Sequence, residues 1–335
     1  MKLLFFIMSL VLFSAHAIEE DMNYTDNMKN MILPFYQTHG ARIDFKGEEG
    51  VSLSAIKFIH PQALGSIVLV QGWSETHAKY LEVIYDLYQA GYSVYTYDHR
   101  GQGFSKHLVA SNNQISHVEY FDYYLKDFKT FMDTIVLKDV KDRPYLLSHS
   151  MGGAISLFYL KEFQKDFKAA VLCSPMLQIN TKPYPEAVAY ALVKGLNFLG
   201  KGKNYAPGKG DYEPTMSFEE NIVTGSKLRF EMAQFITNTY PATILGGPSV
   251  NWVYESIKAT KALKGIGKDI KLPLMVFKAT DDQIVKIERM STLCEDASNC
   301  RLEVFEGAAH EVLMETDLYR DRAFSEVLEF FKTHP

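Results

Sequence analysis

The sequence lacks the residue spacings that bind metals and the charge runs that bind nucleic acids. Neither C-x-x-C nor H-E-x-x-H occurs in the 335 residues, which argues against a metal site. No dense basic run is present, so nucleic acid is not an expected partner. No repeat or low-complexity segment interrupts a composition that is 47% hydrophobic and 13% aromatic. These absences leave a globular chain with one large core.

Cysteine is scarce, with three residues in the whole chain. Cys173 lies in an apolar, strand-like run and is interpreted as an inert core residue. Cys294 and Cys300 lie close together around a polar loop. In an exported protein this pair forms a local disulfide or remains as two free thiols, and the sequence leaves both states open.

The N-terminal apolar run, residues 3–13, is well short of the ~20 residues that a membrane-spanning helix needs. Lys2 precedes it and Ala15-His16-Ala17 follows it, which is typical of a cleaved signal peptide over residues 1–17. We therefore expect export to the periplasm or the medium, with a membrane anchor as the alternative. Cleavage would leave 34 Lys and Arg against 40 Asp and Glu, a formal charge of −6.

Short apolar runs alternate with helical patterns along most of the chain. Two runs around a turn at residues 47–50 alternate like a β-hairpin. Later runs, bounded by polar or glycine turns, are typical of buried parallel strands: 67–70, 93–97, 145–147, 169–173, 274–277 and 302–305. Apolar residues at helical spacing lie between or after them, at 80–88, 121–135 and 324–331. This alternation predicts an α/β fold with a mainly parallel central sheet and helices on both faces.

The alternation breaks from about residue 176 to residue 271, where six prolines separate helical pieces. We predict a helical cap inserted here into a single domain, residues 18–335. Within the cap an apolar stripe has Lys194 beside it and consists of Val188, Leu192, Leu196 and Leu199. The stripe either packs as a cap helix over the sheet or contacts a membrane, and the two are compatible.

Residues 148–152, Ser-His-Ser-Met-Gly, form a G-x-S-x-G pattern in which Ser148 replaces the first glycine. A short apolar run precedes them and an apolar helical pattern follows, as a strand, sharp turn and helix require. Such a turn holds its central residue in strained backbone at a cost of roughly 1–3 kcal/mol, so its neighbours must be small. The context predicts Ser150 as a nucleophile.

A serine hydroxyl needs an imidazole to take its proton and a carboxylate to orient that imidazole. With this kind of turn the partners follow in the order Ser, Asp or Glu, His. Only His310 and His334 come after Ser150, and His334 lies at the chain end, where residues fray. For the acid, Asp281 and Asp282 follow the run 274–277. The spacing Asp-x-Ile-Val favours Asp282, which leaves Asp281 as a solvated turn residue.

An oxyanion formed at Ser150 needs two backbone N–H donors. We predict those of Met151, after the nucleophile, and Trp73, in a loop where Gly72 lets the backbone approach a substrate. His149 either supports the turn or lines the pocket. Residues 98–105 follow another strand and lack the Lys-Ser/Thr of a phosphate loop, so they are interpreted as a structural turn.

Several motifs together resemble the α/β-hydrolases of the monoacylglycerol lipase and lysophospholipase group. They comprise residues 71–73, 98–103 and 148–154 and the loops of Asp282 and His310. Residues 246–257 and 307–315 look more narrowly like the bacterial lysophospholipases of the L-two type, and the likeness spans roughly Phe35 to the C-terminus. It implies cofactor-free hydrolysis of the acyl ester of a single-chain lipid, with Ser150, Asp282 and His310 as triad and Trp73 and Met151 as oxyanion hole.

The chain departs from that group at two positions, and both concern substrate fit. Gln71 stands where many of these hydrolases have a histidine before the oxyanion glycine, and Ser148 replaces the first glycine of the nucleophile turn. The group is also associated with the cytoplasmic side of the inner membrane, whereas this chain carries an export pattern. A broad carboxylesterase or monoacylglycerol lipase is the alternative activity, and an inactive lipid-binding protein is a further one. Lys194, with Lys201 and Lys203, would favour a phosphate head group and peripheral membrane association.

Overall fold

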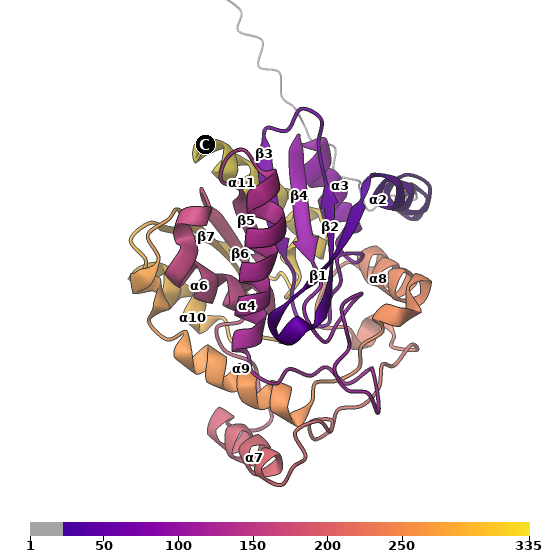
Figure 1. The fold of residues 1–335 in the computed structure, drawn as a ribbon, viewed down its shortest axis with the longest axis vertical. Coiled ribbons are helices and arrows are strands. Elements are labelled where there is room, and N and C mark those ends of the chain that lie inside the picture. The colour runs from indigo at the N-terminus through magenta and orange to yellow at the C-terminus, as the bar shows by residue number, and fades with distance from the viewer. Residues whose placement is uncertain (1–22) are drawn as a thin grey trace, which may run out of the picture.

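A sheet of eight strands runs through the centre of the molecule (Figure 1). The computed structural model describes residues 23–335. The strand order is β1-β2-β4-β3-β5-β6-β7-β8, in which β1 pairs antiparallel with β2, β2 with β4, and all other neighbours are parallel. The predicted mainly parallel sheet is confirmed. The strands are β1 Ala41–Lys46, β2 Ser52–Phe58, β3 Gly65–Val70, β4 Tyr92–Tyr97, β5 Tyr145–His149, β6 Ala170–Cys173, β7 Leu274–Ala279 and β8 Cys300–Phe305.

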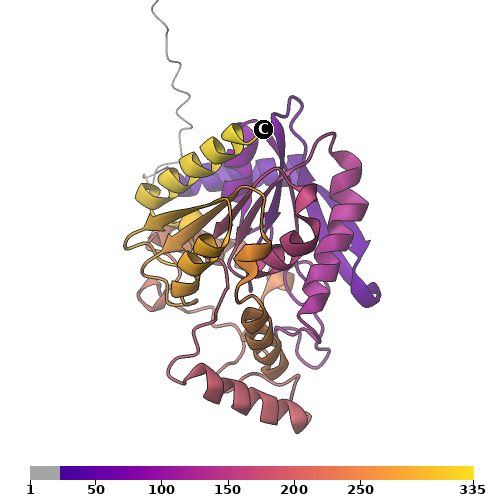
Figure 2. The ribbon, with the colours of Figure 1, turned by 90° about the vertical axis from the view of Figure 1, so that its left-hand side faces the viewer.

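Helices cover both faces of the sheet, as predicted. Side chains alternate along a strand, so Ile67 and Leu69 of β3 belong to one core, while Val68 and Val70 belong to the other. The first core includes α1 to α3 and α11, and the second includes α4, α6, α9 and α10 (Figure 2). The helices are α1 Tyr24–Asn27, α2 Leu33–His39, α3 Leu81–Gln89, α4 Asp122–Phe131, α5 Leu137–Asp139, α6 Met151–Phe163, α7 Glu186–Phe198, α8 Lys227–Thr239, α9 Val250–Ala262, α10 Glu288–Asp296 and α11 Asp317–Thr333.

The long connection from β6 to β7 contains α7, α8 and α9 and contributes no strand to the sheet. Helix α7 packs on α9 and lies at one end of the molecule (Figure 1). Helix α8 is tied to the body of the fold by Arg229, whose Nη2 lies 3.0 Å from a carboxylate oxygen of Glu82 on α3. The same guanidinium donates to the backbone oxygen of Glu315 at 2.7 Å. Both side chains are buried, so this ion pair fixes α8 against α3 and the loop before α11.

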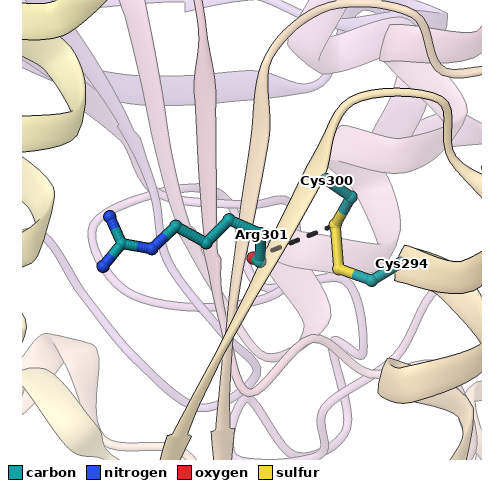
Figure 3. Close-up of a disulfide and its surroundings, with 3 residues drawn as sticks. All are labelled: Cys294, Cys300 and Arg301. Carbon is teal, nitrogen blue, oxygen red and sulfur yellow. Dashed lines mark hydrogen bonds between the residues drawn. A yellow bond between two sulfur atoms is a disulfide. The ribbon is translucent and has the colours of Figure 1, made fainter.

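Cys294 at the end of α10 and Cys300 at the start of β8 are joined by a disulfide (Figure 3). Cys173 is a free, buried cysteine in β6, in accord with its interpretation as a core residue. The predicted signal peptide, residues 1–17, lies outside the described residues. Within residues 23–335, none of the helices has the length and apolar character that crossing a membrane requires.

Candidate active site

Ser150 lies in the sharp turn between β5 and α6, with φ 50° and ψ −117°. This conformation is costly for a residue with a side chain, and the glycines that follow let it form. A Cβ on Gly152 would lie 2.2 Å from the backbone oxygen of Val70, and one on Gly153 would lie 2.7 Å from Pro175 Cβ. The two glycines therefore let the first turn of α6 approach the backbone of β3 and Pro175 closely.

Ser150, His310 and Asp282 are hydrogen-bonded in series. The Ser150 Oγ lies 2.8 Å from His310 Nε2, and His310 Nδ1 lies 2.6 Å from Asp282 Oδ2. The side chains of His310 and Asp282 are almost fully buried. These distances are those of a serine whose proton an imidazole can accept, with a carboxylate orienting the ring.

The second oxygen of Asp282 is held by its own loop. Its Oδ1 accepts hydrogen bonds from the backbone N–H groups of Ile284 at 2.8 Å and Val285 at 3.0 Å. These contacts explain the Asp-x-Ile-Val spacing, because the residues two and three positions later supply the N–H groups that orient the carboxylate. The neighbouring Asp281 is exposed.

The three side chains meet because each follows a strand of the parallel sheet. Ser150 follows β5, Asp282 follows β7 and His310 follows β8. The carboxyl ends of parallel strands lie at one edge, where ligands and reacting groups gather in open α/β sheets. The fold thereby brings together residues up to 160 positions apart.

The backbone N–H groups of Trp73 and Met151 have no acceptor in the part of the chain that the structure describes. Gly72 lies close to the nucleophile, since a Cβ there would be 3.1 Å from Ser150 Cβ. The Trp73 indole donates to Ser116 Oγ at 2.7 Å and packs on Trp252, with ring centroids 5.2 Å apart. The indole thus holds its loop without engaging the backbone N–H, and the role of that N–H as an oxyanion donor stays a prediction.

The turn at residues 98–105 holds the loop that contains Gly72. Gln102 donates to the backbone oxygen of Gly72 at 2.9 Å, and Gln71 donates to Asp98 at 2.6 Å. A Cβ on Gly103 would lie 2.1 Å from the Asp98 carboxylate, so this position needs glycine. The glutamine at position 71 is therefore a structural partner of the turn.

His149 is buried and both of its ring nitrogens face protein oxygens. Its Nδ1 lies 3.1 Å from a Glu75 carboxylate oxygen, and its Nε2 lies 3.3 Å from the backbone oxygen of His310. These contacts place it in support of the turn and the His310 loop. Glu75 was not among the predicted site residues, and no local sequence pattern signals it, because its partner His149 lies 74 positions away in the chain.

Lys194 is exposed on α7, the outermost helix of the β6–β7 connection, and does not lie in the hydrogen-bonded site (Figure 1). Lys201 and Lys203, which follow the same helix, are also exposed. These lysines are thus on the surface, and within the described residues none of them hydrogen-bonds to Ser150, His310 or Asp282. A contact between Lys194 and a substrate head group stays a prediction.

The family model described as serine aminopeptidase, S33 (Hydrolase_4) matches residues 61–317, which include every residue of the hydrogen-bonded series. The chain belongs to this family of α/β-hydrolases. Among curated proteins, it is 32% identical to a probable lysophospholipase L2 of Haemophilus influenzae, over 89% of this chain and 94% of the relative. It is 30% identical to lysophospholipase L2 of Escherichia coli K12, over 87% of each chain.

Solved structures share the fold of this α/β-hydrolase at lower identity. A soluble variant of monoglyceride lipase from Saccharomyces cerevisiae aligns with a TM-score of 0.68 at 18% identity, over 89% of this chain and 97% of the other. A carboxyl esterase from Bacillus coagulans aligns with a TM-score of 0.70 at 16% identity, over 89% and 99%. These matches confirm the α/β-hydrolase fold.

Proposed function

We propose that this α/β-hydrolase cleaves the acyl ester of single-chain lipids, either lysophospholipids or monoacylglycerols. The observation that carries the proposal is the unbroken series from the Ser150 hydroxyl through His310 to Asp282. The sequence relationship to proteins named lysophospholipase L2 supports an ester of this class as the substrate.

In the proposed mechanism, Ser150 Oγ attacks the acyl carbonyl while His310 Nε2 takes the hydroxyl proton. Asp282 fixes the ring so that Nε2 faces the serine and stabilises the imidazolium that forms. The N–H groups of Trp73 and Met151 donate to the developing oxyanion. His310 then protonates the leaving alcohol, and water, activated by the same ring, releases the fatty acid from the acyl-enzyme.

The exposed face of α7 supports a substrate that comes from a lipid surface. Four apolar side chains are largely exposed there: Val188 52%, Leu192 45%, Phe198 91% and Leu199 67%. The exposed lysines near them are Lys182, Lys194, Lys201 and Lys203. An apolar face with a basic border fits a bilayer that contains anionic lipids. We propose that α7 contacts such a surface while the site receives the single-chain lipid.

Hydrolysis assays with purified protein test the activity. We expect turnover of lysophosphatidylcholine or of a monoacylglycerol with the same acyl chain, and loss of that turnover in Ser150→Ala. Equal turnover of both lipids and of short p-nitrophenyl esters would favour the broad carboxylesterase. Absence of turnover of every ester by the folded protein would contradict the proposal.

We also propose that the protein is exported after removal of residues 1–17. The basic start, the short apolar run and Ala15-His16-Ala17 support this, and a Cys294–Cys300 disulfide fits an oxidising compartment. The expected result is a mature chain that begins at residue 18 in the periplasmic or secreted fraction, identified by N-terminal sequencing. An intact N-terminus in the cytosolic fraction would contradict it.

A further inference from the structure

Glu75 is a buried carboxylate beside the site that takes no part in the hydrogen-bonded series. Only 3% of the residue is exposed, in the loop between β3 and α3. Its Oε2 accepts hydrogen bonds from the backbone N–H of Gly72 and from Tyr80 at 2.7 Å, and it faces His149 at 3.1 Å. Its Oε1 accepts from Lys79 at 3.1 Å. One side chain thus joins four groups from the oxyanion loop, the start of α3 and the nucleophile turn.

The contacts of His149 define its protonation. One ring nitrogen faces the Glu75 carboxylate and the other faces the backbone oxygen of His310, and both of these oxygens only accept hydrogen bonds. A neutral imidazole has one N–H and satisfies one of them, whereas the imidazolium satisfies both. Burial opposes the charged form, but the Glu75 carboxylate outweighs burial and raises the pKa of His149.

Lys79 extends the cluster to the residue after His310. Its ammonium lies between Glu75 Oε1 and Glu311 Oε1, 2.5 Å from the latter. Burial opposes ionisation of Glu75, yet His149 and Lys79 hold the pKa of that carboxyl well below its usual range. With His149 protonated, two carboxylates face two cations, so the buried charges balance, as charges removed from water require.

The two peptides that meet at Gly72 are each held by one hydrogen bond. Glu75 binds the N–H of Gly72, and Gln102 binds the carbonyl oxygen of the same residue at 2.9 Å. In a trans peptide the N–H points opposite to the carbonyl, so the Gln102 contact fixes the direction of the Trp73 N–H, while the Glu75 contact holds the preceding Gln71–Gly72 peptide. That N–H is one of the two donors proposed for the oxyanion.

We propose that Glu75 is a positioning residue for the hydrolysis, which fixes the oxyanion loop through Gly72 and the His310 loop through protonated His149 and through Lys79. The proposal rests on the proposed function. Glu75 would thereby lower the energy of the transition state by keeping the oxyanion donors in place, because misplacing them by about 1 Å costs on the order of 10² in rate.

The substitution Glu75→Gln tests this role, with Glu82→Gln as the matched control. Glu82, on α3, is also a buried carboxylate and lies outside the hydrogen-bonded site. It forms ion pairs with Arg229 and Arg320. We expect both variants to lower Tm. Glu75→Gln alone should lower kcat, by about 10- to 100-fold with KM within about twofold. An unchanged kcat in Glu75→Gln, or an equal loss in Glu82→Gln, would overturn the proposal.

NMR titration of the His149 ring gives a readout that does not depend on activity. We expect this ring to be protonated at neutral pH in the wild-type protein and to titrate at lower pH in Glu75→Gln. A neutral His149 ring at pH 6 in the wild-type protein would overturn the charge assignment. If Glu75→Gln fails to fold, His149→Gln replaces it and should give the same loss of kcat. A wild-type protein that cleaves no ester would refute the proposed function and leave the titration as the test of the Glu75–His149 pair.

Discussion

Asp282 differs from its neighbour Asp281 in every contact that matters for the proposed chemistry. Asp282 faces His310 Nδ1 and is held by two backbone N–H groups, whereas Asp281 is exposed. We expect Asp282→Asn to lower kcat by about 10⁴, because an amide at this position favours the wrong imidazole tautomer. The control Asp281→Asn should keep kcat within about twofold. Steady-state hydrolysis of the preferred lipid measures both, and a similar loss in the two variants would contradict the assignment of Asp282.

The residues that hold the reacting groups were harder to predict than the reacting groups themselves. Ser150, His310 and Asp282 follow a fixed order along the chain and occur beside strand patterns, so their meeting was predictable. Glu75 and Lys79 in the loop after β3 meet His149 at the end of β5 and Glu311 after β8 only when these three parts of the chain lie side by side. No local pattern records such contacts, and their residue types are common on exposed surfaces.

At the scale of elements, helix α7 carries the proposed contact with lipid. Replacing both Phe198 and Leu199 with Glu should reduce binding to phosphatidylglycerol-containing vesicles by at least about tenfold, since two apolar contacts are lost and two negative charges face the anionic surface. Leu318→Glu is the control, because Leu318 is 78% exposed on α11, away from α7. Vesicle co-sedimentation measures the binding.

Binding by the double variant at the wild-type level, or an equal loss in Leu318→Glu, would show that α7 is not the contact surface. Turnover of a soluble short-chain ester should stay near the wild-type value in both variants, because neither change touches the hydrogen-bonded series.

Strands were predictable as elements and the helices between β6 and β7 were less so. Each strand-like run of the sequence overlaps a strand of the sheet. In β3 to β7, burial on both faces leaves a short continuous apolar run between turns. Helices α7 to α9 have mixed exposure, and α8 is fixed by the ion pair of Arg229 with Glu82. The packing of these helices depends on contacts with residues far away in the chain, and the hydrophobic periodicity of a single segment does not predict such contacts.

At the scale of the whole molecule, buried neutral histidines make folding sensitive to acid. Burial lowers the pKa of His99 to about 4, and it also lowers the pKa of His77. A lowered histidine pKa means that the unfolded chain binds the proton more readily, so stability falls as pH drops below about 6.5. His149, with its raised pKa, acts in the opposite sense and loses its contribution as pH rises.

Comparison of variants isolates the contribution of His99. When the pH falls from 7.5 to 5, His99 should lower the free energy of unfolding by about 2 kcal/mol. The substitution His99→Gln should remove that part of the pH dependence. Urea unfolding at the two pH values measures the free energies. An identical pH dependence in wild type and His99→Gln would contradict the neutral, buried state of His99.

Covalent labelling with a fluorophosphonate, followed by peptide mapping, tests most directly whether Ser150 is an activated nucleophile. We predict one label per molecule, located on Ser150, with no labelling and a loss of turnover on the order of 10⁶ in Ser150→Ala. The control Ser156→Ala, a buried serine of α6, should label like the wild-type protein. A folded protein that is unlabelled or is labelled at another residue, or a Ser150→Ala variant with near-normal hydrolysis, would contradict the account.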